Sequence, residues 1–166
     1  MSEVVRLPAR GLDGLAFTPY GEVLEPRGSL RPYFGSGRTS VEQVRMPSGA
    51  LGPQIEQLAR HDSYDQVFAQ VEGRLALVVA PEPEEGRPLV DYDRTVAFVL
   101  EPGDVVMVRR GAWHTVVPLG DVTFVNVTRR DDEEDLTAGE SGRHYISNVN
   151  TKERDGRILQ VEDPSP

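Results

Sequence analysis

The sequence predicts an all-β protein, built as a sandwich or barrel of short strands. Sixteen glycines and thirteen prolines recur along the 166 residues and separate short apolar runs, which is typical of strands joined by turns. The composition is 38% hydrophobic and 27% charged, as in a globular domain rather than a disordered chain. The length fits a single domain.

The predicted strands follow one another along the first 130 residues and number about eight to eleven. Alternating or β-branched apolar residues predict strands at 4–7, 20–24, 41–46, 66–70, 74–80, 96–100, 105–108, 116–119 and 122–127. Residues 55–60 fit a helical turn or a strand, and we predict a strand because the neighbouring segments are strands. The intervening segments are expected to be a helical turn at 12–17, a loop at 26–38 and an acidic turn at 81–88.

The domain is predicted to span residues 1–130, followed by a charged C-terminal arm at 131–166. The run RRDDEEDL, which begins at Arg129, is expected to be a solvated surface segment. Apolar residues recur at 145–146 and 157–161. They indicate that the arm packs on the domain or on a partner subunit.

Charge and composition exclude several classes of protein. Lys+Arg number 18 and Asp+Glu 27, so the formal net charge is −9, whereas a nucleic-acid partner needs a basic surface. Cysteine is absent, which excludes disulfides, thiolate nucleophiles and cysteine-bound metal clusters. No apolar run approaches the roughly 18–20 residues of a membrane span, and the N-terminus lacks an apolar signal core. We therefore expect a cytoplasmic protein that binds neither nucleic acid nor membrane.

One histidine ends a motif of two glycines that flank a short apolar strand. In EPGDVVMVRRGAWH, residues 101–114, Gly103 opens a turn, Gly111 makes a second turn and His114 begins the next strand. This pattern resembles the second motif of the cupin family, whose fold is a double-stranded β-helix, or jelly-roll barrel. The resemblance places His114 at the barrel mouth, with Gly111 permitting the tight turn that precedes it.

The first cupin motif is matched in part. His61 falls on the second histidine of its His-x-His pair, and Ala59 stands at the first. Gln66 falls on the position of the motif's glutamate, and Gly73 on that of its glycine.

The sequence around this incomplete motif resembles one branch of the cupins, the ureidoglycolate lyase family. The segments that carry the likeness are LARHDSYDQVF at 58–68, FTPYGEV at 17–23, VVAP at 78–81 and RRGAWH at 109–114. The resemblance covers about residues 15–128. It implies a lyase that splits ureidoglycolate into glyoxylate and urea, a step in the use of allantoin, on a cupin barrel that is usually dimeric.

Two further functions stay open. Ala59 and Thr115 stand where the family has polar or ionisable side chains, which favours a non-catalytic cupin that binds a small carboxylic acid. A metal-dependent cupin oxygenase or isomerase is the third reading, and the small number of histidines weighs against it.

The candidate catalytic residues are His61 and His114. Cleavage of ureidoglycolate needs a base for its hydroxyl proton and an acid for the leaving nitrogen, and a group with a pKa near 6.5 suits both tasks. The two histidines would transfer protons directly or through a bound metal and its water.

The remaining candidates bind substrate or metal. The substrate-binding residues are Arg60 and Arg110 for the carboxylate, Gln66 for the urea group, and Trp113 and Tyr64 for an apolar wall. The metal ligands are His61, Gln66 and His114. Because two imidazoles and a neutral amide make a poor transition-metal site, any divalent ion here is expected to be loosely bound and exchangeable. The expected partners are a small anionic substrate and a second copy of the chain.

Overall fold

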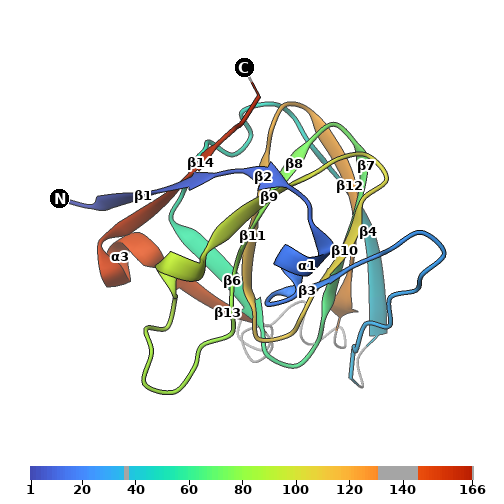
Figure 1. Cartoon of the computed structure of the whole chain (residues 1–166), viewed down its shortest axis with the longest axis horizontal. Helices are drawn as coiled ribbons and strands as arrows, with labels where there is room; N and C mark the ends of the chain where they lie inside the picture. The colour runs from blue at the N-terminus through green and yellow to red at the C-terminus, as the bar shows by residue number, and fades with distance from the viewer. Residues whose placement is uncertain (36–37, 131–145, 166) are drawn as a thin grey trace.

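The computed structural model describes residues 1–35, 38–130 and 146–165, which form three β-sheets (Figure 1). The five-stranded sheet has the order β3 (Gly21–Val23), β10 (Val105–Val108), β7 (Gln66–Glu72), β12 (Val122–Arg130), β4 (Arg38–Met46). The six-stranded sheet has the order β13 (Ile146–Asn150), β6 (Gln57–His61), β11 (Trp113–Pro118), β8 (Leu75–Ala80), β9 (Val96–Leu100), β2 (Arg10–Gly11). The three-stranded sheet has the order β1 (Glu3–Pro8), β14 (Arg157–Glu162), β5 (Gln54–Ile55).

Helical structure in the described residues is brief. It comprises α1 (Gly14–Phe17), the 3₁₀ turn η1 (Tyr92–Arg94) and α3 (Thr151–Asp155). No helix of the described part of the chain is long and apolar enough to cross a membrane. The all-β class predicted from the sequence is confirmed, and the described residues form fourteen strands rather than eight to eleven.

The five- and six-stranded sheets face each other and enclose the first of two apolar cores. From β6 to β12 the chain passes repeatedly between these two sheets, as in a jelly roll. The inner core is filled by apolar side chains from both sheets and from α1, among them Phe17, Phe68, Leu77, Phe98 and Phe124. Three of its rings, those of Phe17, Tyr20 and Phe98, pack edge to face.

A second core lies on the outer face of the six-stranded sheet. The three-stranded sheet covers this face with Leu7, Ile55 and Leu159, which pack against strand residues such as Leu58 and Trp113. The central strands β8 and β9 of the six-stranded sheet are therefore buried on both faces, and β8 accordingly reads as an unbroken apolar run, LALVVA.

Two glycines allow tight turns that bring strands together. Gly73 has φ +71°, and a Cβ there would lie 2.1 Å from the backbone oxygen of Asp121. Gly111 has φ +87°, and a Cβ there would lie 2.6 Å from the side-chain carboxyl carbon of Glu82. Both positions therefore require glycine, and the Gly111 turn delivers the chain into β11.

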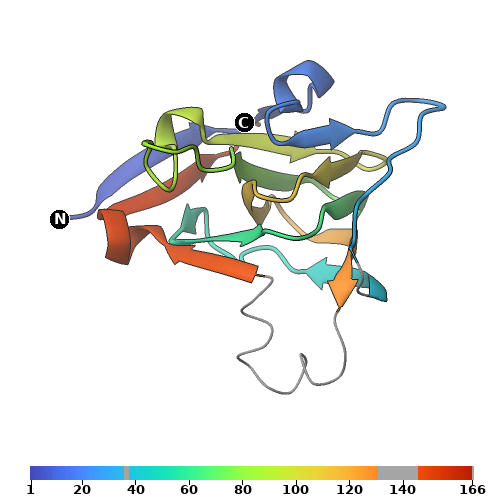
Figure 2. The ribbon, with the colours of Figure 1, turned by 90° about the horizontal axis from the view of Figure 1, so that it is seen from below.

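The predicted strands agree with the structure in place, with local differences. The run 55–60 is divided between β5 and β6, and the strand expected at 116–119 begins earlier, at Trp113. The loop expected at 26–38 falls between β3 and β4, the two edge strands of the five-stranded sheet, and its described part, residues 26–35, lies along one side of the molecule (Figure 2).

The segment expected to be an arm contributes strands to the sheets. Within residues 146–165, β13 pairs with β6, and β14 lies between β1 and β5. α3 begins at an Asn150 cap and ends at Gly156, which has φ +67°. The expectations for residues 131–145 lie outside the described residues.

Candidate active site

The two histidines of the partial cupin motifs lie side by side inside the barrel. β6 and β11 pair with His114 opposite Ala59, so His61 lies two residues further along β6. The backbone N–H of Gly111 donates to the carbonyl oxygen of His61, 2.7 Å away, and ties the turn before β11 to the end of β6. As a result, the two imidazole rings lie 5.0 Å apart, centroid to centroid.

Strand alternation decides which side chains reach this interior. In β6, Leu58 packs into the outer core, so His61 points to the opposite face. In β11, Trp113 and Val117 belong to the outer core, so His114 points inward. The first position of the motif's histidine pair also points inward, but Ala59 offers no ligand or proton there.

A chain of hydrogen bonds leads from His61 across the five-stranded sheet. His61 Nε2 lies 2.6 Å from Gln66 Oε1, and Gln66 Nε2 donates to Asn126 Oδ1 at 2.7 Å. Gln66 and Asn126 lie on the interior faces of β7 and β12, where Asn126 is the register partner of Phe68. Both ends of the Gln66 amide are therefore occupied by protein groups.

Asn126 is a site residue that the sequence analysis missed. It follows Val122 and Phe124 in the inward phase of β12, where both neighbours in phase belong to the inner core. A polar side chain at an inward position of an apolar strand was the available signal. Its partner could not be identified from sequence, because the contact spans 60 residues.

Aromatic rings enclose both histidines. Tyr64 stacks on His61 with centroids 4.4 Å apart, and Phe68 packs against His114 in a T-shaped arrangement with centroids 6.0 Å apart. Burial, reinforced by the nearby His61, lowers the pKa of His114 to about 3. His114 is therefore neutral near pH 7, with Nδ1 3.5 Å from the carbonyl oxygen of Ala112.

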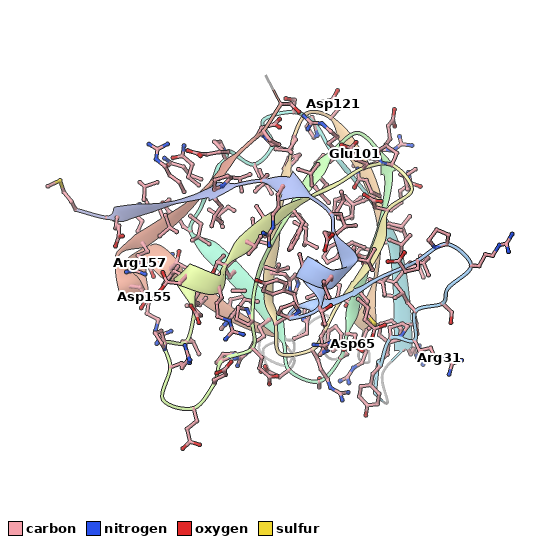
Figure 3. The ribbon with its side chains drawn as sticks, in the orientation of Figure 1. Arg31, Asp65, Glu101, Asp121, Asp155 and Arg157 are labelled. Carbon is pink, nitrogen blue, oxygen red and sulfur yellow. The ribbon has the colours of Figure 1, made fainter. Side chains whose placement is uncertain are left out.

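The rim beside the histidines is held by one carboxylate. Asp65 Oδ1 accepts from the backbone N–H of Arg110, and Oδ2 accepts from that of Tyr33, both at 2.8 Å. In Figure 3, Asp65 lies at the end of the barrel opposite Glu101 and Asp121. The Arg110 side chain is exposed and lies over the Tyr33 ring, 4.4 Å from its centroid. A permanently charged guanidinium thus lies at the rim.

Arg129 is also part of this end of the barrel. The sequence analysis assigned it to a solvated charged run, and this was wrong, because its side chain is buried. Its guanidinium lies over Tyr64, 5.4 Å from the ring centroid, on the residue that stacks on His61. Arg129 lies three residues beyond Asn126 in β12, in the opposite phase of that strand, and its guanidinium donates to the carbonyl oxygen of Phe34 at 3.4 Å.

Arg60 and Trp113 are not brought together with the histidines. Both lie on the outer face of the six-stranded sheet, where Arg60 stacks over the Trp113 ring at 4.7 Å and pairs with Asp62 at 2.7 Å. The Trp113 indole N–H donates to the carbonyl oxygen of Leu89. The structure thus separates these two predicted substrate-binding residues from the site, because each is the strand neighbour of an inward-facing histidine.

The donor set does not fit a tight metal site. Among the described residues, no group of three or more histidine or acidic side chains could hold a metal ion. The predicted ligands are two imidazoles and a neutral amide, and Gln66 Oε1 is already engaged with His61 Nε2. Transition metals prefer three or four imidazole, thiolate or carboxylate donors. This donor set therefore suits proton transfer better than metal binding.

Comparison with known proteins adds a family likeness. The family model described as Ureidoglycolate lyase matches residues 31–146. The chain is 29% identical over 144 residues to "Ureidoglycolate lyase" of Rhizobium etli strain CIAT 652, covering 75% of this chain and 84% of that one. It is 28% identical to the protein of that name from Agrobacterium fabrum over the same shares, and 26% identical to that from Mesorhizobium japonicum, over 80% and 91%.

Solved structures give more distant matches. A cupin-2 domain containing protein from Shewanella frigidimarina has a TM-score of 0.37 at 14% identity, over 58% of this chain and 82% of that one. Oxalate decarboxylase from Lactobacillus farciminis, in a formate complex, has a TM-score of 0.45 at 16% identity, over 81% and 32%.

Proposed function

The chain belongs to the ureidoglycolate lyase family, and we propose that it cleaves ureidoglycolate to glyoxylate and urea. In this reaction the hydroxyl proton leaves, the C–O bond becomes a carbonyl and the C–N bond breaks. The electron pair of that bond stays on nitrogen, which takes up a proton to give urea. One proton therefore moves from oxygen to nitrogen overall, and no oxidant or reductant is needed.

The observation that carries the proposal is the buried pair His61–His114 inside the barrel. The rings lie 5.0 Å apart, which is close enough for both to contact one small substrate. The pair is enclosed by Tyr64 and Phe68, so charge that develops on a substrate would be poorly screened by water.

The two histidines have different tasks because their surroundings differ. His114 stays neutral near pH 7, so its role is to form hydrogen bonds with the substrate. It does not take up the transferred proton to become an imidazolium. His61 is the proton carrier: with its Nε2 proton directed at Gln66, it takes the hydroxyl proton at Nδ1 and returns it to the leaving nitrogen.

The substrate carboxylate is assigned to the guanidinium groups at this end of the barrel. Arg110 at the rim attracts the anion, and Arg129, behind Tyr64, adds a second positive charge. Gln66 holds His61 and Asn126 and so serves the base, in place of the urea contact expected from the sequence. Tyr64 forms the apolar wall against His61.

The test is a glyoxylate-release assay on ureidoglycolate with chelator-treated protein. Wild-type turnover that falls about a hundredfold or more in both His61→Ala and His114→Ala would support the proposal. Ligand-induced thermal stabilisation of the wild type without turnover would overturn it in favour of a binding protein. Added divalent ions, in a parallel arm, are expected to change the rate little.

We further propose a cytoplasmic homodimer that acts in allantoin use, with no nucleic-acid or membrane partner. The family likeness supports the pathway, and the net charge of −9 supports the absence of a nucleic-acid partner. The dimer is carried over from the resemblance of the sequence to that family. Sedimentation equilibrium at assay concentration tests the dimer: a monomer mass would contradict it.

A further inference from the structure

We propose that Asn126 is a positioning residue for the reaction. Through Gln66, it keeps the proton of neutral His61 on Nε2 and the lone pair on Nδ1. The catalytic meaning of this inference rests on the proposed function. The position of the proton does not, and it can be measured without any substrate.

The direction of the hydrogen-bond chain is set by the atom that Asn126 presents to Gln66, which is its acceptor oxygen Oδ1. An amide carries one acceptor oxygen and one donor nitrogen. Gln66 Nε2 is directed at Asn126 Oδ1, 2.7 Å away, so Gln66 Oε1 must face His61 Nε2, 2.6 Å away. An acceptor at that distance requires a proton on Nε2.

Removal of the Asn126 oxygen would leave the orientation of the Gln66 amide undetermined. Without it, the Gln66 amide can rotate by half a turn and present its N–H₂ to His61 Nε2. His61 would then accept at Nε2 and carry its proton on Nδ1, where the proposed base needs a lone pair.

Other contacts hold the ring and the backbone of His61. Tyr64 stacks on His61 at an interplanar angle of 21°, and the backbone carbonyl of His61 is held by Gly111. These two contacts do not determine which ring nitrogen carries the proton. Gln66 and Asn126 determine it, and because Gln66 is a neutral amide it places no negative charge beside His61.

The test measures the tautomer by ¹H–¹⁵N NMR of histidine-labelled, chelator-treated protein at pH 8, with His61→Asn used to assign the signals. Wild type is expected to show a pyrrole-type Nε2 and a pyridine-type Nδ1. Asn126→Asp should keep this pattern, because a carboxylate can still accept from Gln66 Nε2. Asn126→Leu should shift the population toward the Nδ1–H form.

A matched control separates positioning from stability. Asn150→Ala also removes an asparagine oxygen that accepts a hydrogen bond, here from the backbone N–H of Glu153 at 3.0 Å. It should destabilise the fold and leave the His61 pattern unchanged. An Nδ1–H wild type, or an Asn126→Leu variant with the wild-type pattern, would overturn the proposal.

The kinetic arm gives a second readout. Asn126→Leu should lower kcat for ureidoglycolate about tenfold to a hundredfold with KM nearly unchanged, and Asn126→Asp should recover most of it. An equal kcat in wild type and Asn126→Leu would count against the inference. If wild type fails to cleave ureidoglycolate, the proposed function fails, and the NMR result still decides the role of Asn126.

Discussion

Acid should destabilise this fold through His114. Its pKa is lowered to about 3 by burial, whereas in the unfolded chain it returns to about 6.5. At pH values between these two pKa values, His114 is protonated in the unfolded state and neutral in the folded state. The free energy of unfolding therefore falls as pH decreases. The contribution is fully present above pH 6.5 and is lost as pH falls toward 3.

The size of the effect follows from the two pKa values. Linkage gives a loss of about 2 kcal/mol between pH 7 and pH 5 from this single group. Carboxylates titrate mainly below pH 5 and add their own losses there, so the interval from 7 to 5 isolates the histidine best.

The assay is urea unfolding at pH 5, 6 and 7, followed by the fluorescence of Trp113, the chain's single tryptophan, which is buried in the outer core. His114→Asn keeps a nitrogen donor near the carbonyl oxygen of Ala112 and removes the titration. Its stability should fall between pH 7 and pH 5 by about 2 kcal/mol less than that of wild type.

Equal pH dependence in wild type and His114→Asn would refute this reasoning. The wild-type protein supplies an independent check, because its result does not depend on how well the His114→Asn variant packs. Its His114 ring should remain neutral by NMR at pH 5, and an imidazolium at that pH would show that burial does not lower the pKa as described.

Three further outcomes are expected. Gly73→Ala should cost at least about 2 kcal/mol more than Gly103→Ala, because both have positive φ but only Gly73 meets backbone; urea titrations compare them. Asp65→Ala should speed hydrogen exchange at the amides of Arg110 and Tyr33 and cost about 1–3 kcal/mol, and unchanged exchange there would contradict the rim described. Metal analysis after gel filtration should find well below about one ion per chain, as the poor donor set implies, and stoichiometric retention would contradict it.

The barrel and its histidine pair were accessible from sequence because their signals are local. The spacing from Gly103 through Gly111 to His114 lies within one short stretch that contains β10, a turn and the start of β11, and His61 and Gln66 are five residues apart. Short apolar runs bounded by turns predicted the strands, and most of the strands lie where they were expected.

What escaped the sequence depends on register or on phase. Asn126 reaches Gln66 only because β12 pairs with β7, a contact that no local pattern encodes. Arg60 and Trp113 were expected in the site because they adjoin His61 and His114. Adjacent residues of a strand point to opposite faces of the sheet. Because Arg60 and Trp113 are next in sequence to inward-facing histidines, their side chains lie on the outer face, away from the site.

The C-terminal strand was missed for a related reason. β14 forms its parallel ladder with β1, in which Glu3 pairs with Arg157, and a parallel partner cannot be recognised from a turn. The composition of residues 129–136 also suggested the end of the domain. A charged run marks a surface, and here the chain returns to the sheets after it.

The central position of β14 in the three-stranded sheet has a consequence for biosynthesis. β1 emerges early from the ribosome, but its only strand partner in the described sheets is β14, and β5 likewise pairs with β14. Neither strand can be seated until nearly all of the described residues have been synthesised. The outer core therefore closes late, and a nascent chain halted before β14 would expose Leu7, Ile55 and Leu58 to chaperones and proteases.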